Sequence, residues 1–237
     1  MTRRRWIADE VSGDRASLTG AHADHLARVL RVRVGQEFDI ATGNAVRRGR
    51  VASIAGGRIE FDLGDELPAR TASQITLLLA VFKFDRMEWA IEKCTELGVS
   101  RIVPVIARRT DVHLAAASAK RAERWRRIVP QAAEQSRQAT PPAVTAPVKL
   151  AEAMDLATGL RIVLAESEQQ NLLRDVLESQ PAMQETVLAV GPEGGWTEDE
   201  LQQFHKAEWI SASLGSTILR AETAAVAATA IVASQLI

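Results

Sequence analysis

Two glycine-bearing loops near the carboxyl end of the sequence carry the residue types best suited to binding a small molecule. The first, residues 191–196, reads Gly-Pro-Glu-Gly-Gly-Trp and follows an apolar run at 186–190. The second, residues 214–224, reads Leu-Gly-Ser-Thr-Ile-Leu-Arg-Ala-Glu-Thr-Ala and also follows an apolar run. Proteins of the α/β class bind ligands at the carboxyl ends of their strands. The pair therefore predicts a ligand site, although a glycine-rich turn between strand and helix can also be purely structural.

The first loop lacks the glycine spacing of a phosphate site. Neither Gly-x-Gly-x-x-Gly nor Gly-x-x-x-x-Gly-Lys-Ser/Thr occurs there, so its backbone N–H groups are not expected to surround a phosphate. Pro192 stiffens the turn, and the carboxylate of Glu193 would repel an anion. A carboxylate in the loop suits a ligand that is cationic or rich in hydroxyl and amino groups. S-adenosylmethionine, with its sulfonium, ammonium, ribose and adenine, is such a ligand.

Other catalytic and metal-binding constellations have weaker support. No serine of the C-terminal third lies in a Gly-x-Ser-x-Gly elbow. His22 and His25 stand three residues apart without a third ligand nearby, so we expect no metal site. The single cysteine, Cys94, falls on the apolar stripe of a predicted helix and is expected to pack in the core.

The composition is that of a globular protein. The chain has 237 residues, of which 46% are apolar and 25% charged, and this length allows one large domain or a small and a medium one. No apolar run approaches the roughly 18 residues of a membrane span, and the basic start is not followed by the apolar stretch of a signal peptide. One cysteine excludes a disulfide framework, so a reducing, cytoplasmic location is expected.

The formal net charge of -1 hides a basic segment in the middle of the chain. A basic belt on a near-neutral protein predicts that a polyanion docks on that face. The alternative is an ordinary solvated helix face. The cations of this belt are Arg101, Arg108, Arg109, Lys120, Arg121, Arg124, Arg126 and Arg127, opposed only by Asp111 and Glu123.

Residues 1–70 resemble a small β-rich unit. Apolar residues at helical spacing predict one short helix over 22–30. Short strands separated by turn residues favour a small barrel. The expected strands lie at 37–41, 48–54 and 58–63, with Gly56-Gly57 as a hairpin turn between the last two and residues 68–73 as a linker.

From residue 74 onward strands and helices alternate, which predicts an α/β domain over 74–237 with a mostly parallel sheet. Asp85 is the expected N-cap of the first helix, Pro141-Pro142 is expected to end the second, and Thr197-Glu198-Asp199-Glu200 is a capping box for the fourth. The expected strands lie at 75–82, 101–106, 160–165, 186–190 and 209–214, and the expected helices at 85–97, 119–138, 171–178, 197–207 and 221–236.

Several motifs, taken together, give the whole chain a family resemblance. The two C-terminal loops closely resemble the paired motifs of the ribosomal RNA small subunit methyltransferases of type E. These are the 16S rRNA (uracil-1498-N3)-methyltransferases of the SPOUT class. The other motifs that fall in family order are Arg5-Trp6, His25-Leu26-x-x-Val29-Leu30-Arg31, Lys83-x-Asp85-Arg86-Met87, Glu92-Lys93-x-Thr95-Glu96-Leu97-Gly98 and Glu134-Gln135-Ser136.

The chain also departs from the family pattern. The family usually has Asp-Gly where this chain reads Ala41-Thr42-Gly43-Asn44, and often has Gly-Arg where it reads Arg137-Gln138. A frequent Arg-Thr-Glu-Thr is Arg220-Ala221-Glu222-Thr223 here. Because Arg137-Gln138 replaces Gly-Arg, it stays open which residue makes the RNA or active-site contact expected there.

The resemblance implies an N-terminal PUA-like RNA-binding barrel over 1–70 and a trefoil-knotted SPOUT methyltransferase domain over 74–237. It implies a homodimer that uses S-adenosylmethionine, with the cofactor site near the subunit interface, to methylate N3 of a uracil in the 16S rRNA of the small ribosomal subunit. No metal and no membrane partner are expected. The residues implied to bind the cofactor are Leu164, Gly191, Pro192, Glu193, Gly194, Leu214, Gly215, Ile218, Leu219, Arg220 and Thr223.

Arg220, at the mouth of the second loop, is the expected catalytic residue. When N3 of uracil loses its proton, a guanidinium would stabilise the negative charge on the ring. The alternative is a helix-start arginine paired with a carboxylate such as Glu222. For Glu193 two roles stay open: accepting a hydrogen bond from the cofactor, or ordering the loop. The residues expected to contact RNA phosphates are Arg4, Arg5, Arg28, Arg31, Lys83, Arg86 and Arg137.

Two other classes of function compete with this one. A non-catalytic RNA-binding assembly factor could keep the same fold, but the intact loop motifs argue against it. A metabolic α/β enzyme is a third class, and the basic belt together with the β-rich unit argues against it.

Overall fold

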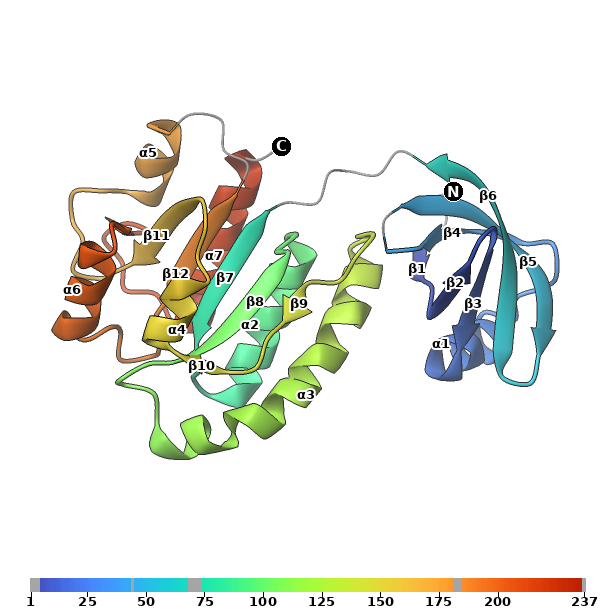
Figure 1. The fold of residues 1–237 in the computed structure, drawn as a ribbon, viewed down its shortest axis with the longest axis horizontal. Coiled ribbons are helices and arrows are strands. Elements are labelled where there is room, and N and C mark those ends of the chain that lie inside the picture. The colour runs from blue at the N-terminus through green and yellow to red at the C-terminus, as the bar shows by residue number, and fades with distance from the viewer. Residues whose placement is uncertain (1–4, 44, 68–73, 181–184, 236–237) are drawn as a thin grey trace. The chain divides into compact units, whose positions relative to one another are not determined.

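The computed structural model describes residues 5–43, 45–67, 74–180 and 185–235, which divide into two compact units (Figure 1). Unit 1 comprises Met1–Ala72 and Ala133–Pro141, and unit 2 comprises Ser73–Ala132 and Pro142–Ile237. The boundaries expected from the sequence place segment 133–141 in the second domain, whereas it packs with unit 1. The predicted linker, 68–73, lies outside the described residues.

Unit 1 is a β-sheet with one helical segment. Among its described residues, six strands pair in the order β1-β4-β5-β6-β3-β2. The predicted strands at 37–41, 48–54 and 58–63 are confirmed, but β1 to β3 were missed because they are short and lack a clear apolar alternation. The strands are β1 (Arg5–Ile7), β2 (Glu10–Ser12), β3 (Arg15–Thr19), β4 (Glu37–Ala41), β5 (Val46–Ala55) and β6 (Arg58–Leu67).

The predicted helix over 22–30 is confirmed as two joined pieces, an α-helical turn α1 (Gly20–Asp24) and a π-helical turn η1 (His25–Val29). Leu26 from this segment packs with Ile40 and Phe61 of the sheet in one apolar core. The hairpin turn between β5 and β6 is also confirmed. Gly56 and Gly57 have φ of 59° and 71°, and turns that fit the twist of a hairpin need such left-handed residues.

Unit 2 is built on a parallel sheet. Among its described residues, strands pair in the order β10-β8-β7-β12-β11-β13, and β9 also pairs with β8. All the strands expected from the sequence are confirmed, whereas β9 and β10 were missed because two residues are too few to give a pattern. The strands are β7 (Ile75–Ala80), β8 (Arg101–Ile106), β9 (Ala143–Val144), β10 (Val148–Lys149), β11 (Leu160–Leu164), β12 (Thr186–Val190) and β13 (Ile210–Ala212).

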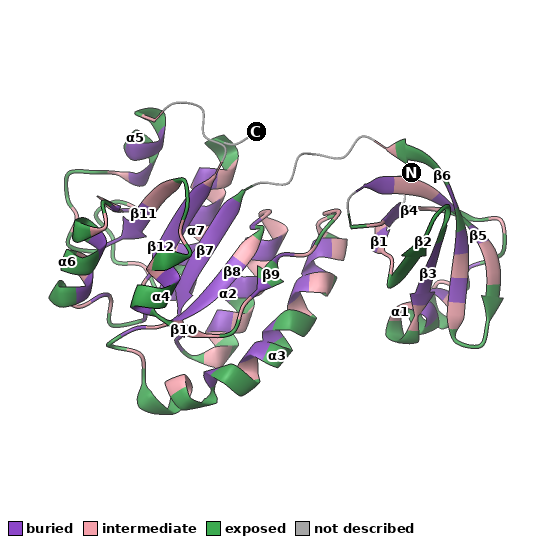
Figure 2. Cartoon of the chain, in the orientation of Figure 1, coloured by how far each residue is buried: buried purple, intermediate pink, exposed green. Residues whose placement is uncertain are grey.

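Helices cover both faces of this sheet, and the side chains of β7 alternate between the two layers. Leu77 and Leu79 pack in the core that includes the buried residues of α2, α3, α5 and α7. Leu78 and Ala80 pack in the core shared with α4 and α6. The central strands are therefore buried on both faces (Figure 2), as their continuous apolar runs predict. The helices are α2 (Phe84–Glu96), α3 (Val112–Gln135), α4 (Leu150–Asp155), α5 (Leu173–Glu178), α6 (Glu198–Lys206) and α7 (Ala221–Gln235).

Two predicted helix boundaries are wrong. The N-cap of α2 is Lys83, which makes no side-chain cap bond, and Asp85 lies in the first turn instead. There its charge still faces the positive end of the helix dipole. Helix α3 begins near Asp111, whose Oδ1 accepts hydrogen bonds from the N–H groups of His113 (2.8 Å) and Leu114 (3.2 Å). The sequence placed that start at 119.

Helix α3 also ends earlier than the Pro141-Pro142 pair predicts. Arg137 adopts a left-handed φ of 60°, and the N–H of Gln138 bonds to the carbonyl of Ala133 at 2.9 Å. This closure is the usual C-terminal motif of a helix, and its left-handed position normally holds glycine. The glycine that the family often has at this place would suit that backbone, and Arg137 occupies the same conformation here.

Candidate functional site

A cavity of about 370 Å³ opens where β11, β12 and β13 end. Leu164, Val190 and Ala212 are the last residues of these strands, and all three line it. The strands are neighbours and parallel, so their carboxyl ends lie at one edge of the sheet. This is where open α/β sheets bind ligands. The two loops that continue β12 and β13 form much of the wall.

The first of these loops, residues 191–196, is a tight turn. The N–H of Gly195 bonds to the carbonyl of Pro192 at 2.8 Å, and Gly195 has a left-handed φ of 68°. A Cβ on Gly191 would lie 3.2 Å from Nε1 of the Trp196 ring, which is closer than a side chain comfortably fits. Glycine at these two positions therefore allows both the turn and the close approach of the indole.

Arg109 holds the same loop from the side of β8. Its Nη1 donates to the carbonyl of Gly194 at 2.5 Å and to that of Trp196 at 3.2 Å. The turn that carries Arg109 is itself fixed, because Oγ1 of Thr110 accepts from the N–H of Ala107 and donates to the carbonyl of Val81. Arg109 therefore belongs to the wall of the cavity rather than to a free basic face.

A row of alternating charges runs from the first loop to the start of α7. Nη1 of Arg86 lies 3.2 Å from Oε1 of Glu193, and Nε of Arg86 lies 3.8 Å from Oε1 of Glu222. Nη1 of Arg220 lies 4.0 Å from the same oxygen of Glu222. The side chain of Glu222 is only 11% exposed, whereas that of Arg220 is 71% exposed.

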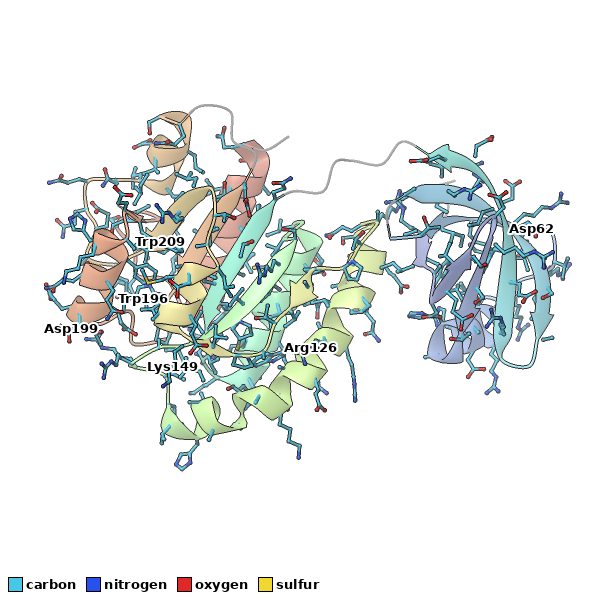
Figure 3. All side chains as sticks on the ribbon, viewed as in Figure 1. Asp62, Arg126, Lys149, Trp196, Asp199 and Trp209 are labelled. Carbon is cyan, nitrogen blue, oxygen red and sulfur yellow. The ribbon has the colours of Figure 1, made fainter. Side chains whose placement is uncertain are left out.

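The loop is anchored at its far end by the start of α6. The predicted capping box is confirmed: Oγ1 of Thr197 accepts from the N–H of Glu200, and Oε2 of Glu200 accepts from the N–H of Thr197 at 2.8 Å. The other oxygen of Glu200 accepts from the N–H of Arg108 at 2.7 Å. Phe204 of α6 packs edge to face against two buried rings, Trp196 and Trp209, with 5.0 Å between the centroids of each pair. Figure 3 labels the two tryptophans.

The second loop, residues 214–220, is held far less. Gly215 has a φ of 118°, and a Cβ there would meet no atom within 4 Å. Ile218 is 77% exposed although it is apolar, and it lines the cavity. No hydrogen bond joins residues 214–219 to other described parts of the chain. This side of the cavity is open.

Comparison with known proteins identifies the family. The model of an RNA methyltransferase domain matches residues 69–233. The chain is 34% identical to the ribosomal RNA small subunit methyltransferase E of Synechocystis sp., over 88% of this chain and 69% of that protein. It is 31% identical to the enzyme of the same name from Rickettsia conorii, over 88% of this chain and 85% of that one. This chain belongs to the ribosomal RNA small subunit methyltransferase E family.

Solved structures have the same fold. A family member from Neisseria gonorrhoeae bound to S-adenosyl methionine has a TM-score of 0.83 at 32% identity, covering 97% of this chain and 96% of that one. A methyltransferase from Legionella pneumophila in complex with SAM has a TM-score of 0.84 at 26% identity, covering 99% and 98%. The α/β methyltransferase fold predicted for this family member is thus confirmed.

The cavity gathers most of the residues that the sequence singles out for the cofactor. All of them except Arg220 and Thr223 lie on its wall. Arg220 lies beside the wall, between Leu219 and Ala221, and Thr223 is exposed on α7. Glu166 and Ser167 line the cavity but were missed, although they lie just beyond the end of β11, after Ala165. The rule that ligands bind at strand ends could have found them. Arg109 was expected in the basic belt, and nothing in the sequence indicated its place on the cavity wall.

The arginines expected to contact RNA divide between the units. In unit 1 the guanidinium of Arg5 donates to the carbonyl of Arg137, and burial lowers the pKa of Arg5. Nε of Arg28 lies 3.5 Å from Oδ1 of Asp24, and the side chain of Arg31 is exposed. In unit 2, Lys83 is exposed and Arg86 faces two carboxylates. Arg4 lies outside the described residues.

The basic belt of the sequence is not one free face. Arg121 and Arg124 both pair with Glu88, at 2.5 Å and 2.9 Å. Nε of Arg126 donates to the carbonyl of Val144 at 3.0 Å. Arg109 donates to two carbonyls of the first loop. Much of this charge is therefore used inside unit 2.

The single cysteine packs in the core, as its place on the apolar stripe of a helix predicts. Cys94 is buried on α2, and burial raises the pKa of its thiol to about 12. Such a thiol is a poor nucleophile. Within the part of the chain that the structure describes, no three His, Cys, Asp or Glu side chains come together as metal ligands. None of the described helices has the length and apolar character to cross a membrane.

Proposed function

We propose that this chain methylates N3 of one uracil, of the uracil-1498 type, in the 16S rRNA of the small ribosomal subunit, using S-adenosylmethionine. The observation that carries the proposal is the cavity between the two glycine loops, in the place where both family motifs meet. The names of the relatives support it, as does the relative from Neisseria gonorrhoeae that is bound to S-adenosyl methionine.

The residues of the cavity fit this cofactor. A volume of about 370 Å³ lies within the range of small-molecule sites, roughly 300–1,000 Å³. The wall carries the carboxylates Glu166 and Glu198, which favour a ligand with a sulfonium and an ammonium group over a phosphate. Ser167 and the backbone of the second loop offer partners for adenosine hydroxyl and amino groups.

The chemistry assigned to the chain is positioning and electrostatics. S-adenosylmethionine, when bound, supplies an electrophilic methyl group. The chain must hold the uracil in line with it, which is the main source of rate in a displacement. N3 must lose its proton, and negative charge then spreads to O2 and O4 of the base. The guanidinium of Arg220, exposed beside the cavity wall, is the group that would stabilise this charge.

The finer architecture belongs to the same proposal. Unit 1 would serve as the PUA-like RNA-binding barrel (residues 1–70), and residues 74–237 would form the trefoil-knotted SPOUT domain. The six described strands of unit 1 and the β12-β11-β13 neighbourhood of the cavity support these assignments. The cations that would contact phosphates include Arg5, Arg28, Arg31, Lys83 and Arg137. RNA affinity should then fall steeply with salt, and the target base must be unstacked to enter the cavity.

A homodimer is also part of the proposal. Helix α7 is apolar on all sides, a composition typical of a helix that is buried all round. Yet Val226, Ala227 and Ile231 are only partly buried, and Trp89 on the neighbouring helix α2 is 46% exposed. A second copy of the chain would cover these residues. Because its proposed substrate is 16S rRNA, the enzyme would act in the cytoplasm.

The test is the methylation state of 16S rRNA in a strain that lacks this gene. Mass mapping should reveal the loss of one methyl group from one uracil, restored by the wild-type gene and not by Arg220→Ala. Titration of the purified protein with S-adenosylmethionine separates the competing function. A non-catalytic assembly factor would give no heat of binding and an unchanged rRNA methylation pattern.

A further inference from the structure

Arg86 occupies a position that neither a phosphate contact nor a surface charge explains. It lies in the first turn of α2, and α2 follows β7, which pairs with β12. The strand order therefore brings the start of α2 to the edge of the sheet where the first loop leaves β12 (Figure 1). From there the guanidinium reaches Glu193 in that loop and Glu222 at the start of α7.

The contact with Glu193 fixes the tip of the first loop. Glu193 lies inside the turn that the Pro192–Gly195 hydrogen bond closes. Its Oε1 accepts from Nη1 of Arg86 at 3.2 Å. Arg109 holds the opposite side of the loop through the carbonyls of Gly194 and Trp196. The loop is thus held between two arginines that come from different elements.

The second contact of Arg86, with Glu222, lies at the start of α7, where the second loop ends. Oε2 of Glu222 is buried and has no hydrogen-bond partner among the described residues. A buried carboxylate is costly unless cations compensate it. Within the described chain, the cations that face this side chain are Arg86 at 3.8 Å and Arg220 at 4.0 Å. Glu222 is therefore the shared counter-ion of both arginines at the start of α7.

The charges of this row cancel. Arg86 and Arg220 each carry one positive charge, and Glu193 and Glu222 each carry one negative charge, so their sum is zero at neutral pH. The side chain of Arg86 is 31% exposed and faces both carboxylates, whereas that of Arg220 is 71% exposed. Little of the Arg86 charge is left to attract a phosphate, and Arg220 remains the guanidinium open to substrate.

We propose that Arg86 is a positioning residue of the methyltransferase site rather than an RNA contact: it holds the cofactor loop through Glu193 and sets Arg220 through Glu222. The role of Glu193 is then to order the loop. This inference rests on the proposed function, and it assigns to the same site a link between cofactor binding and the catalytic arginine.

The experiment is a double-mutant cycle read by titration with S-adenosylmethionine. The variants are Arg86→Met, Glu193→Gln and the double variant, with Lys93→Met as the matched control. Lys93 lies on the same helix, and among the described residues its ion pairs are with Glu92 and Glu96. We expect Arg86→Met and Glu193→Gln each to weaken binding about fivefold. The double variant should bind the cofactor no more weakly than Arg86→Met, because each single variant already removes the contact between Arg86 and Glu193. Lys93→Met should bind like wild type.

Two further readouts separate positioning from a fold defect or a phosphate contact. Arg86→Met should lower kcat together with cofactor affinity, and Arg86→Lys should recover only part of both, because an ammonium cannot span two carboxylates. Affinity for 16S rRNA and its dependence on salt should stay unchanged in Arg86→Met. A phosphate contact would instead weaken RNA binding and reduce the salt slope by about one.

The outcomes distinguish the two levels of the proposal. If the wild-type protein binds no S-adenosylmethionine and methylates no rRNA, the proposed function fails. If the wild type binds and methylates but Arg86→Met binds the cofactor equally well, the assignment of Arg86 is overturned. Additive losses in the double variant, or a reduced salt slope for RNA, would overturn it as well.

Discussion

The two loops that form the cavity share a glycine-bearing sequence but are held in opposite ways. Residues 191–197 are fixed by an internal turn, by Arg109, by Arg86 and by the capping box of α6. Residues 214–220 make none of these contacts within the described chain, and most of them are exposed. The first loop is thus a wall held by contacts with the rest of unit 2, whereas the second loop is an exposed wall without such contacts among the described residues.

This difference indicates that the two loops have different roles in binding and turnover. A loop whose shape is fixed before binding loses little entropy when a ligand arrives, so it suits a ligand used in every turnover, such as the cofactor. An exposed loop beside Arg220 can close on a large substrate or against a second copy of the chain. Changes to the fixed loop should therefore reduce cofactor affinity and stability, whereas changes to the open loop should reduce turnover.

The largest effect is expected on the open side. Arg220→Ala should lower the rate of methyl transfer about 100- to 1,000-fold, because the charge on the deprotonated uracil loses its stabilising cation. Binding of S-adenosylmethionine should largely survive. The rate is measured with small subunits from a strain lacking the methyl group, and the affinity by calorimetry. Arg124→Ala, which removes an exposed cation paired with Glu88, is the control. Retained turnover in Arg220→Ala would remove its catalytic role.

A smaller effect is expected on the fixed side. Arg109→Ala removes both hydrogen bonds to the loop carbonyls and should weaken binding of S-adenosylmethionine about tenfold. Arg108→Ala is the matched control, because the bond from Arg108 to Glu200 comes from its backbone N–H, which the substitution keeps. Calorimetric titration of both variants measures the difference. An Arg109→Ala variant with normal affinity and a reduced kcat would contradict the division between the loops.

The two loops should also differ in stability. Thr197→Ala breaks the capping box and should lower the free energy of unfolding by about 1 kcal/mol. Thr217→Ala changes the same residue type on the open loop, where the hydroxyl is exposed, and should stay within about 0.5 kcal/mol of wild type. Urea unfolding of the two variants gives both values. Equal losses would mean that the open loop is held by contacts comparable to those of the fixed loop.

The last prediction concerns Cys94, which lies in the core that α2 shares with α7. Because burial raises the pKa of Cys94 to about 12 from an ordinary 9.0, the thiol should resist a disulfide reagent at pH 8 in the native protein and in all the loop variants. The unfolded chain releases this proton first, so folding stability should fall as pH rises above about 9. Between pH 8 and pH 10, the free energy of unfolding measured in urea should fall less in Cys94→Ala than in the wild type. Rapid labelling of a variant would reveal a disturbed core.

Much of the scaffold could be predicted because its signals are local. The apolar runs at 75–80 and 186–190, the capping box at Thr197 and the glycine turn at 56–57 each act through neighbours in sequence, and all are confirmed. The boundaries of α3 were wrong because its ends depend on single interactions. Asp111 caps its start, and the left-handed Arg137 ends it.

Periodicity and turn chemistry, which lie in adjacent residues, were enough to predict the alternation of strands and helices and the two glycine loops. The family resemblance added the residues expected to bind the cofactor, of which nine lie on the cavity wall. The partners of the arginines, by contrast, depend on the tertiary structure. Arg109 and Gly194 are 85 residues apart, and Arg86 and Glu193 are 107 apart. Charge alone cannot tell whether a guanidinium faces RNA, a loop carbonyl or a buried carboxylate, because that depends on which strands lie side by side.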